Sequence, residues 1–144
     1  MSGAPHIPDA GDLEVGGAPE PMEVGPIRRT HIVRYAGASG DFTPIHHDEP
    51  LAQKVGLPSV FTMGMLQGGM LGHLVADWLG LGHVRRFGMR FETRVWPGDV
   101  LTFSGEVVSV EQDDGVERVT VDVFCDNQAG ERALTGWAVA EYPM

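Results

Sequence analysis

The stretch from Gly64 to Leu79 constrains the fold more than any other part of this chain, because it has the pattern of a helix with two different faces. Large apolar side chains recur every four residues, and a second stripe at the same spacing holds only small residues: Leu66, Met70, Leu74 and Trp78 in the first, Gly64, Gly68, Gly72 and Ala76 in the second. An interior glycine costs a helix about 1 kcal/mol relative to alanine, so tertiary burial must stabilise this one. We predict a buried central helix whose glycine face admits a close neighbour, either a strand or a ligand.

The same stretch is too polar to cross a membrane. Residues 60–81 form the most apolar window of the chain, but Gln67, His73 and Asp77 interrupt it. Each of these polar groups would be costly in lipid. We therefore expect a helix inside a protein core and no membrane partner.

The sequence after this helix has the alternation of β-strands. Over residues 86–95, mostly polar residues alternate with Phe87, Met89, Phe91, Thr93 and Val95. This pattern predicts a strand with one buried face. Further strands are predicted over 100–111, 117–125 and 132–142, because turn-forming residues separate these segments. Before the helix we predict a short strand within 22–27 and helices over 30–38 and 49–55. One long helix followed by four antiparallel strands predicts an α+β fold with the sheet curled around the helix.

Length and composition narrow the class of protein. The 144 residues suit one domain, which we place at 22–144, preceded by a mobile tail over 1–21 that is rich in Gly and Pro. A net charge of −10 argues against nucleic acid as the main partner. Cys125 is the only cysteine, and the first residues lack the basic and apolar regions of a secretory signal, so we expect a cytoplasmic protein.

The residues that point to chemistry lie in the stretch YAGASGDFTPIHHD, from Tyr35 to Asp48. Pro44 forces the preceding residue into an extended conformation and stops any helix, so this stretch is a constrained loop. A carboxylate and an imidazole stand five residues apart in it, at Asp41 and His46. Taken alone, the two side chains fit better as residues that cap and hydrogen-bond a turn than as a catalytic pair. We predict no metal site, because adjacent side chains in extended backbone, such as those of His46 and His47, point in opposite directions.

The stretch resembles the signature of the MaoC-like, or (R)-specific enoyl-CoA hydratase, family, whose usual form is Y-A-x-x-S-G-D-x-N-P-I-H-x-D. Nine residues agree with it: Tyr35, Ala36, Ser39, Gly40, Asp41, Pro44, Ile45, His46 and Asp48. Further resemblance lies in Gly64-Met65-Leu66 and in the segment from Phe91 to Thr102, and it extends over about residues 22–142. The resemblance implies a hot-dog fold, with Asp41 and His46 as the catalytic residues and the backbone N–H of Gly64 as the donor to a thioester oxygen. It implies no cofactor.

Two positions depart from the family pattern. Thr43 stands where the family usually has Asn, and Met63 stands where a His usually precedes the Gly-Met pair. These differences bear on the geometry of the loop and on the substrate class. We expect the substrate site to include Thr43, Met63, Met65, Gly68 and Gly72. The helix sequence also resembles actinobacterial MaoC-like subunits that act on steroid side-chain thioesters.

The reaction implied is the hydration of trans-2-enoyl-CoA to 3-hydroxyacyl-CoA, or the reverse dehydration. It needs a base that deprotonates water and an acid that delivers a proton to the α-carbon, and a carboxylate and an imidazole that hold one water can do both. Two alternatives remain open. The chain could be a hot-dog thioesterase, which would release free thiol, or a non-catalytic or partner-dependent subunit of a heteromeric hydratase.

The expected partners are an acyl-CoA substrate and a second hot-dog chain. A four-stranded antiparallel sheet has at least one unpaired edge, and exposed edges recruit partners. No Pro or Lys interrupts the series Val119, Val121 and Val123. We therefore predict that the last strands lack the residues that keep an exposed strand edge from pairing with another chain. The resemblance implies edge-to-edge assembly, as a homodimer or a heteromer, with the acyl-CoA site between the two domains.

Overall fold

A computed structural model describes residues 6–144 of the chain. Its elements are β1 (Met22–Val24), α1 (Arg29–Ser39), the 3₁₀ helix η1 (Pro44–His46), α2 (Glu49–Lys54), α3 (Gly64–Leu79), β2 (Val84–Phe91), β3 (Leu101–Asp113), β4 (Val116–Asp126) and β5 (Arg132–Pro143). The predicted helices and strands are all present, and the central helix has the predicted bounds. Strand β2 ends at Phe91, four residues before the end of the alternating pattern.

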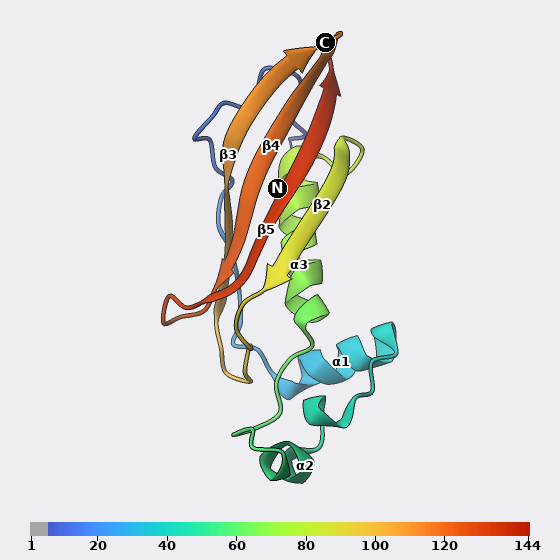
Figure 1. Cartoon of the computed structure of the whole chain (residues 1–144), viewed down its shortest axis with the longest axis vertical. Helices are drawn as coiled ribbons and strands as arrows, with labels where there is room; N and C mark the ends of the chain where they lie inside the picture. Colours follow the sequence, from blue (N-terminus) through green and yellow to red (C-terminus); the bar gives the residue numbers. More distant parts are fainter. Residues whose placement is uncertain (1–5) are drawn as a thin grey trace, which may run out of the picture.

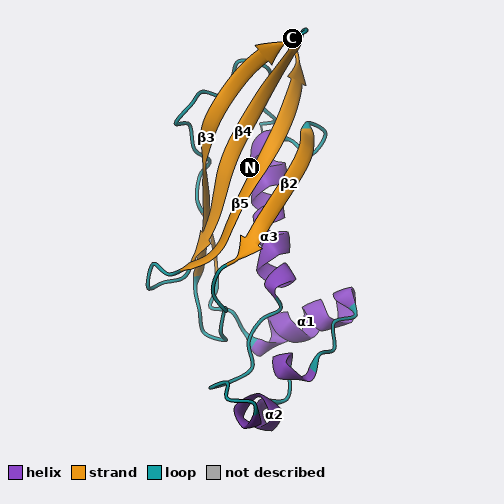
Figure 2. Cartoon of the chain, viewed as in Figure 1, coloured by secondary structure: helices purple, strands orange, loops and turns teal. Residues whose placement is uncertain are grey.

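The five strands form one antiparallel sheet in the order β1-β3-β4-β5-β2. The β3–β4 hairpin turns at Asp114 and Gly115, where φ is 49° and 77°, and two successive residues with positive φ are typical of a tight hairpin turn. Helix α3 runs along one face of the sheet, while α1 and α2 lie beyond its N-terminal end (Figures 1 and 2). The predicted arrangement, a sheet curled around one long helix, is confirmed.

The hydrophobic core lies between α3 and the sheet. Leu71, Val75 and Leu79 of α3 are buried there against residues of the three central strands. Burying a side chain of this kind contributes about 1.5–3 kcal/mol, which outweighs the low intrinsic helix propensity of the glycines. Within residues 6–144, no helix combines the length and the apolar character needed to cross a bilayer.

The glycine face of α3 is filled by side chains of strand β2. A Cβ atom added to Gly64 would lie 2.9 Å from the ring of Phe91, and one added to Gly68 would lie 2.7 Å from the Sδ atom of Met89. Both distances are shorter than an ordinary van der Waals contact of 3.4–4 Å. Of the two neighbours expected for this face, the structure therefore holds the strand.

Two expectations about the sheet are wrong. The face of β2 that carries Phe87 and Phe91 is not fully buried, since these side chains are 36% and 54% exposed. The reason is that β2 is an edge strand, hydrogen-bonded only to β5. Conversely, β4 is the middle strand of the sheet, so Val119, Val121 and Val123 are completely buried and form no free edge.

The opposite edge of the sheet is covered in part by the N-terminal segment. The Gly16 N–H donates to the Val107 carbonyl oxygen at 2.9 Å, and the Val107 N–H donates to the Gly17 carbonyl oxygen at 2.8 Å. Farther along, the Gly11 N–H donates to the buried carboxylate of Glu117 at 2.7 Å. The mobility expected for residues 1–21 stays a prediction: Gly11, Gly16 and Gly17 have hydrogen-bond partners in the sheet, and residues 1–5 lie outside the described residues. Strand β2 is thus the more open edge of the described sheet.

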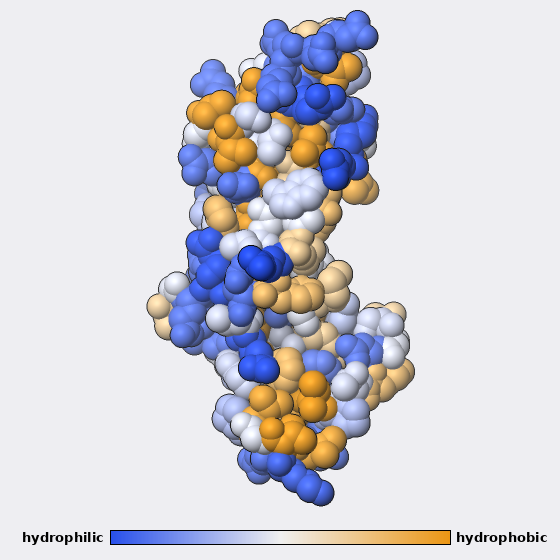
Figure 3. All heavy atoms as spheres, in the orientation of Figure 1, coloured by the Kyte–Doolittle hydropathy of each residue, from blue (hydrophilic) through white to orange (hydrophobic). Residues whose placement is uncertain are grey.

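On the face viewed in Figure 3, apolar side chains lie in small patches among hydrophilic ones.

Candidate active site

The loop that carries Asp41 and His46 is held at both ends. Helix α1 ends where Gly40 adopts a left-handed conformation, with φ of 75°, and donates its N–H to the Ala36 carbonyl oxygen. Thr43 is extended, with ψ of 124°, because Pro44 follows it and begins η1. The predicted constrained loop is present. It lies near the N-terminal end of α3, beyond the sheet (Figure 1).

Asp41 is oriented by Thr43. The Thr43 hydroxyl donates to Asp41 Oδ1 at 2.6 Å, and the Thr43 backbone N–H donates to the same oxygen at 3.2 Å. These bonds, first the hydroxyl and then the N–H, lower the pKa of Asp41, and the nearby His46 adds a smaller effect in the same direction. The carboxylate is therefore charged at neutral pH, with Oδ2 free to face His46.

His46 is buried, with 8% of its surface exposed, and its ring is held by the segment that leads into α3. Its Nδ1 lies 2.7 Å from the carbonyl oxygen of Phe61. A carbonyl oxygen only accepts, so Nδ1 carries a hydrogen, and Nε2 is the ring atom that can accept one. The Phe61 ring also packs edge-on against the imidazole, with 4.8 Å between the ring centroids.

The two acceptors of this pair face each other across a gap that fits a water molecule. Nε2 of His46 lies 3.9 Å from Oδ2 of Asp41, which is too long for a direct hydrogen bond. A water placed about 2.8 Å from each atom would donate one hydrogen to each acceptor. The arrangement can therefore hold and deprotonate a water, which is what general base catalysis of hydration requires.

An apolar cavity of about 370 Å³ opens beside His46. Its lining comes from α1 and the loop, with one residue from the segment before α3: Ile32, Val33, Ala36, Gly37, Phe42, His46, His47 and Met63. Met63, which stands in place of the family's usual His, is buried against Ile32 and Ala36 of α1. His47 is exposed and its Nε2 lies 3.1 Å from the Phe42 carbonyl oxygen, so the two adjacent histidines have separate partners.

A second cavity, of about 550 Å³, lies at the first turn of α3. Gly64 and Gln67 of the helix line it, together with Phe61 and Thr62 before the helix and Phe91 to Arg94, Trp96 and Glu131. The Gly64 N–H belongs to the first turn of α3, where no intrahelical carbonyl can accept its hydrogen. It is therefore available as a donor, and the helix dipole favours negative charge at this end.

The sequence-predicted site residues divide into two groups. The structure gathers Thr43, Met63 and Gly64 with the Asp41–His46 pair or in the two cavities near it. Met65 instead is half exposed on the helix surface. Gly68 and Gly72 lie under Met89 and Phe87 of β2. Their place in the substrate site stays a prediction.

Three residues of this region were missed by the sequence analysis. Phe61 supplies the carbonyl that fixes the His46 ring, and the hydroxyl of Thr62 donates to the side chain of Gln67. A backbone carbonyl leaves no trace in a sequence. Gln67 did leave one, because it is a polar residue inside the most apolar helix of the chain.

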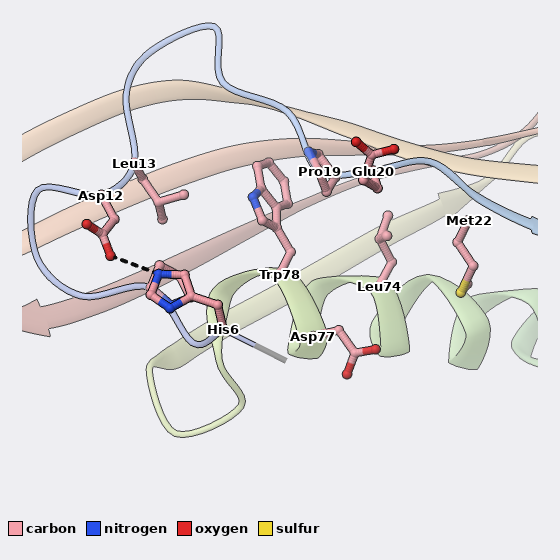
Figure 4. Close-up of a pocket in the computed structure, with 10 residues that line it drawn as sticks. His6, Asp12, Leu13, Pro19, Glu20, Met22, Leu74, Asp77 and Trp78 are labelled. Carbon is pink, nitrogen blue, oxygen red and sulfur yellow. Dashed lines mark ion pairs between the residues drawn. The ribbon is translucent and has the colours of Figure 1, made fainter. Parts of the chain in front are cut away.

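A third cavity, of about 620 Å³, lies away from this region, between the N-terminal segment and the C-terminal half of α3. Leu74, Asp77 and Trp78 of α3 face it, opposite a segment in which His6 Nε2 lies 3.3 Å from Asp12 Oδ2 (Figure 4). It shares no lining residue with the two cavities near Asp41 and His46.

Comparison with known proteins places this geometry in a family. The model of the MaoC-like domain matches residues 13–128. The beta subunit of the 3-oxo-4,17-pregnadiene-20-carboxyl-CoA hydratase of Mycobacterium tuberculosis is 34% identical over 103 residues, which cover 71% of this chain and 77% of the relative. The (R)-specific enoyl-CoA hydratase of Aeromonas caviae is 29% identical over 114 residues, covering 78% of this chain and 84% of the relative.

The fold agrees with the same assignment. A solved structure of an (R)-hydratase from Aeromonas caviae superposes with a TM-score of 0.79 at 25% identity, covering 93% of this chain and all of the other. Together with the family match over most of the sequence, this confirms the hot-dog fold that the signature implied. The chain belongs to the MaoC-like domain family.

Proposed function

We propose that this protein adds water to trans-2-enoyl-CoA thioesters, giving 3-hydroxyacyl-CoA, and catalyses the reverse dehydration. The observation that carries the proposal is the pair formed by the charged Asp41 carboxylate and His46 Nε2, 3.9 Å apart beside an apolar cavity. The names of the two relatives support it, because both are named as hydratases of coenzyme A thioesters.

The chemistry follows from the two acceptors. One of them removes a proton from the bound water as its oxygen attacks the β-carbon, and a proton then passes to the α-carbon, so no other acid is required. Negative charge builds up on the thioester oxygen between these steps. The Gly64 N–H at the start of α3 is the donor that we assign to this oxygen.

The acyl group is assigned to the apolar cavity next to His46. Its walls, formed by Ile32, Val33, Ala36, Phe42 and Met63, offer almost no polar group to a bound chain. A histidine at position 63 would place a polar ring there, whereas Met63 is apolar and flexible and adapts to irregular ligands. This favours a bulky acyl group, in line with the steroid-derived substrate in the name of the mycobacterial relative.

We further propose that the chain works with a second hot-dog chain joined at strand β2. The outer edge of β2 is unpaired within the described residues, and its exposed Phe87 and Phe91 provide apolar surface beside it. The second chain would cover the cavity at Gly64, which Phe91 also lines. A specific second candidate is a partner-dependent subunit, because the mycobacterial relative is itself named as a beta subunit.

The test is hydration of a panel of enoyl-CoA thioesters, from short chains to steroid side chains, followed by the loss of ultraviolet absorbance of the conjugated thioester. Light scattering on the same sample gives the oligomeric state. We expect a dimer that hydrates bulky thioesters. Release of free thiol without hydration would indicate a thioesterase. An inactive monomer would favour the partner-dependent subunit, and an active monomer would refute assembly at β2.

A further inference from the structure

Gln67 is a buried polar residue in the middle of an apolar helix. Its side chain is 3% exposed, and its Oε1 accepts a hydrogen bond of 2.8 Å from the hydroxyl of Thr62, which is also buried. A buried amide is costly unless its hydrogen bonds are satisfied, and an apolar residue would fill the same place without that cost. Packing alone therefore does not explain a glutamine at this position.

The amide nitrogen of Gln67 has no hydrogen-bond partner among residues 6–144. In the same part of the chain, no side-chain nitrogen or oxygen is both sealed from solvent and without a partner. It follows that Nε2 is not sealed. Gln67 lines the cavity of about 550 Å³ together with Gly64, so this cavity is the open space within reach of Nε2. The Thr62 hydroxyl bonds to the oxygen of the amide, which leaves its two N–H groups available to a ligand in this space.

The position of the amide along α3 brings it close to the Gly64 N–H. Helical side chains point back toward the N-terminus of the helix. Gln67 does so far enough to reach Thr62, two residues before the helix begins. Its amide group therefore lies beside the first turn, where the Gly64 N–H is free. Met63 supplies no side-chain cap that would compete for that turn.

We propose that Gln67 Nε2 is a second hydrogen-bond donor to the thioester oxygen of the substrate, beside the Gly64 N–H. This inference rests on the proposed hydration of enoyl thioesters. An oxygen that gains negative charge is stabilised best by several donors fixed in advance in a site that excludes water. Thr62 acts as the positioning residue, because its hydroxyl fixes the orientation of the amide.

The test compares three variants. Gln67→Leu removes the donor but leaves the Thr62 hydroxyl unpaired in the core, which alone would destabilise the protein. The double variant Thr62→Val with Gln67→Leu removes both polar partners, and such a replacement is close to neutral for stability. Thr62→Val alone keeps the amide but releases its orientation, so it serves as the matched control.

Two readouts separate a donor from a packing residue. In steady-state hydration, we expect Gln67→Leu and the double variant to lose about 10²- to 10³-fold in kcat with a small change in KM, as for the loss of one oxyanion donor. Thr62→Val should lose less. The second readout is the bound spectrum of 4-(dimethylamino)cinnamoyl-CoA, whose absorbance shifts to the red when donors polarise its thioester carbonyl. Both variants that lack the amide should show a smaller shift than the wild type.

The outcomes distinguish this inference from the proposed function. A wild type that shifts the probe spectrum but hydrates no thioester would refute hydration and still support the donor, provided that the shift falls in the double variant. A stable double variant with the wild-type kcat and the wild-type shift would overturn the role of Gln67 and leave hydration intact. A wild type that gives no red shift at all would overturn the donor assignment.

Discussion

The close approach of α3 to β2 can be tested with one pair of substitutions in adjacent residues. Gly68 and Gly69 lie in the same turn of the same helix, so replacing either with valine changes helix propensity by the same amount. They differ in surroundings. A Cβ atom on Gly68 would lie 2.7 Å from Met89 Sδ, whereas a Cβ atom on Gly69 would meet nothing within 4 Å. The difference between the variants therefore isolates the contact with Met89.

The expected size of the effect follows from that distance. The added Cβ at Gly68 is about 0.7 Å inside the shortest ordinary contact of 3.4 Å, and valine brings two further carbons into the same space. Overpacking costs about 1–3 kcal/mol, and the lower end of this range applies here, because the atoms in contact belong to the end of the flexible Met89 side chain. In a domain of this size each kcal/mol lowers the melting temperature by about 3 °C. Gly68→Val should therefore melt about 3 °C below Gly69→Val.

Thermal unfolding followed by circular dichroism measures the difference, and a third substitution checks its cause. Met89→Ala removes the atoms in contact, so combining it with Gly68→Val should recover about 0.5–3 kcal/mol relative to the sum of the single effects. It should not couple to Gly69→Val. Equal melting temperatures for the two valine variants would refute the close packing of strand and helix. Equal stability with lost turnover of long-chain thioesters would instead mean that the glycine face admits the substrate.

Three further predictions concern named side chains. Asp41→Asn and His46→Ala should each lower hydration at least about a hundredfold, and near-full activity in either variant would refute the catalytic assignment. Asp41→Asn should change the melting temperature little, whereas His46→Ala should also lower it, because it removes a buried ring that is hydrogen-bonded to the Phe61 carbonyl. The Thr43 hydrogen bonds stabilise the charged carboxylate and lower the pKa of Asp41, so kcat/KM should fall as pH drops through that pKa. Thr43→Val removes the hydroxyl and should move this acid limb to higher pH, whereas Thr43→Ser should leave it in place, and identical profiles for all three proteins would contradict the role of the hydroxyl. Burial, with a smaller effect of the Asp126 charge, raises the pKa of the Cys125 thiol to about 12, so the folded protein should not react with a disulfide reagent at about pH 8, and one thiol should appear on unfolding.

Much of the local structure could be predicted from the sequence, because it depends on neighbours along the chain. The apolar stripe defines the bounds of α3, and Pro44 fixes the extended conformation of Thr43. The signature around Asp41 and His46 identifies the family and the residues to test. Each of these features follows from residues that are near one another in the sequence: the helix from the period of 3.6 residues, the loop from the restricted φ of a proline ring, and the family from the order of side chains in one short motif.

The order of the strands in the sheet could not be predicted from the sequence, and this is why two expectations were wrong. Alternation indicates that a strand has an apolar face, but it does not say what covers that face or how completely. Phe87 and Phe91 alternate as buried residues do, and yet β2 is at the edge of the sheet. Val119 and its neighbours suggested an unprotected edge, and yet β4 lies in the middle.

The sequence by itself determined that α3 is buried and that its glycine face needs a close neighbour. Only the tertiary structure decided that this neighbour is strand β2, that a carbonyl of Phe61 fixes the His46 ring, and that the Thr62 hydroxyl is hydrogen-bonded to the side chain of Gln67. The physical reason is that periodicity and propensity act over a few residues. A contact between distant segments depends instead on the order of the strands and on the packing of the whole core, which no single stretch of sequence records.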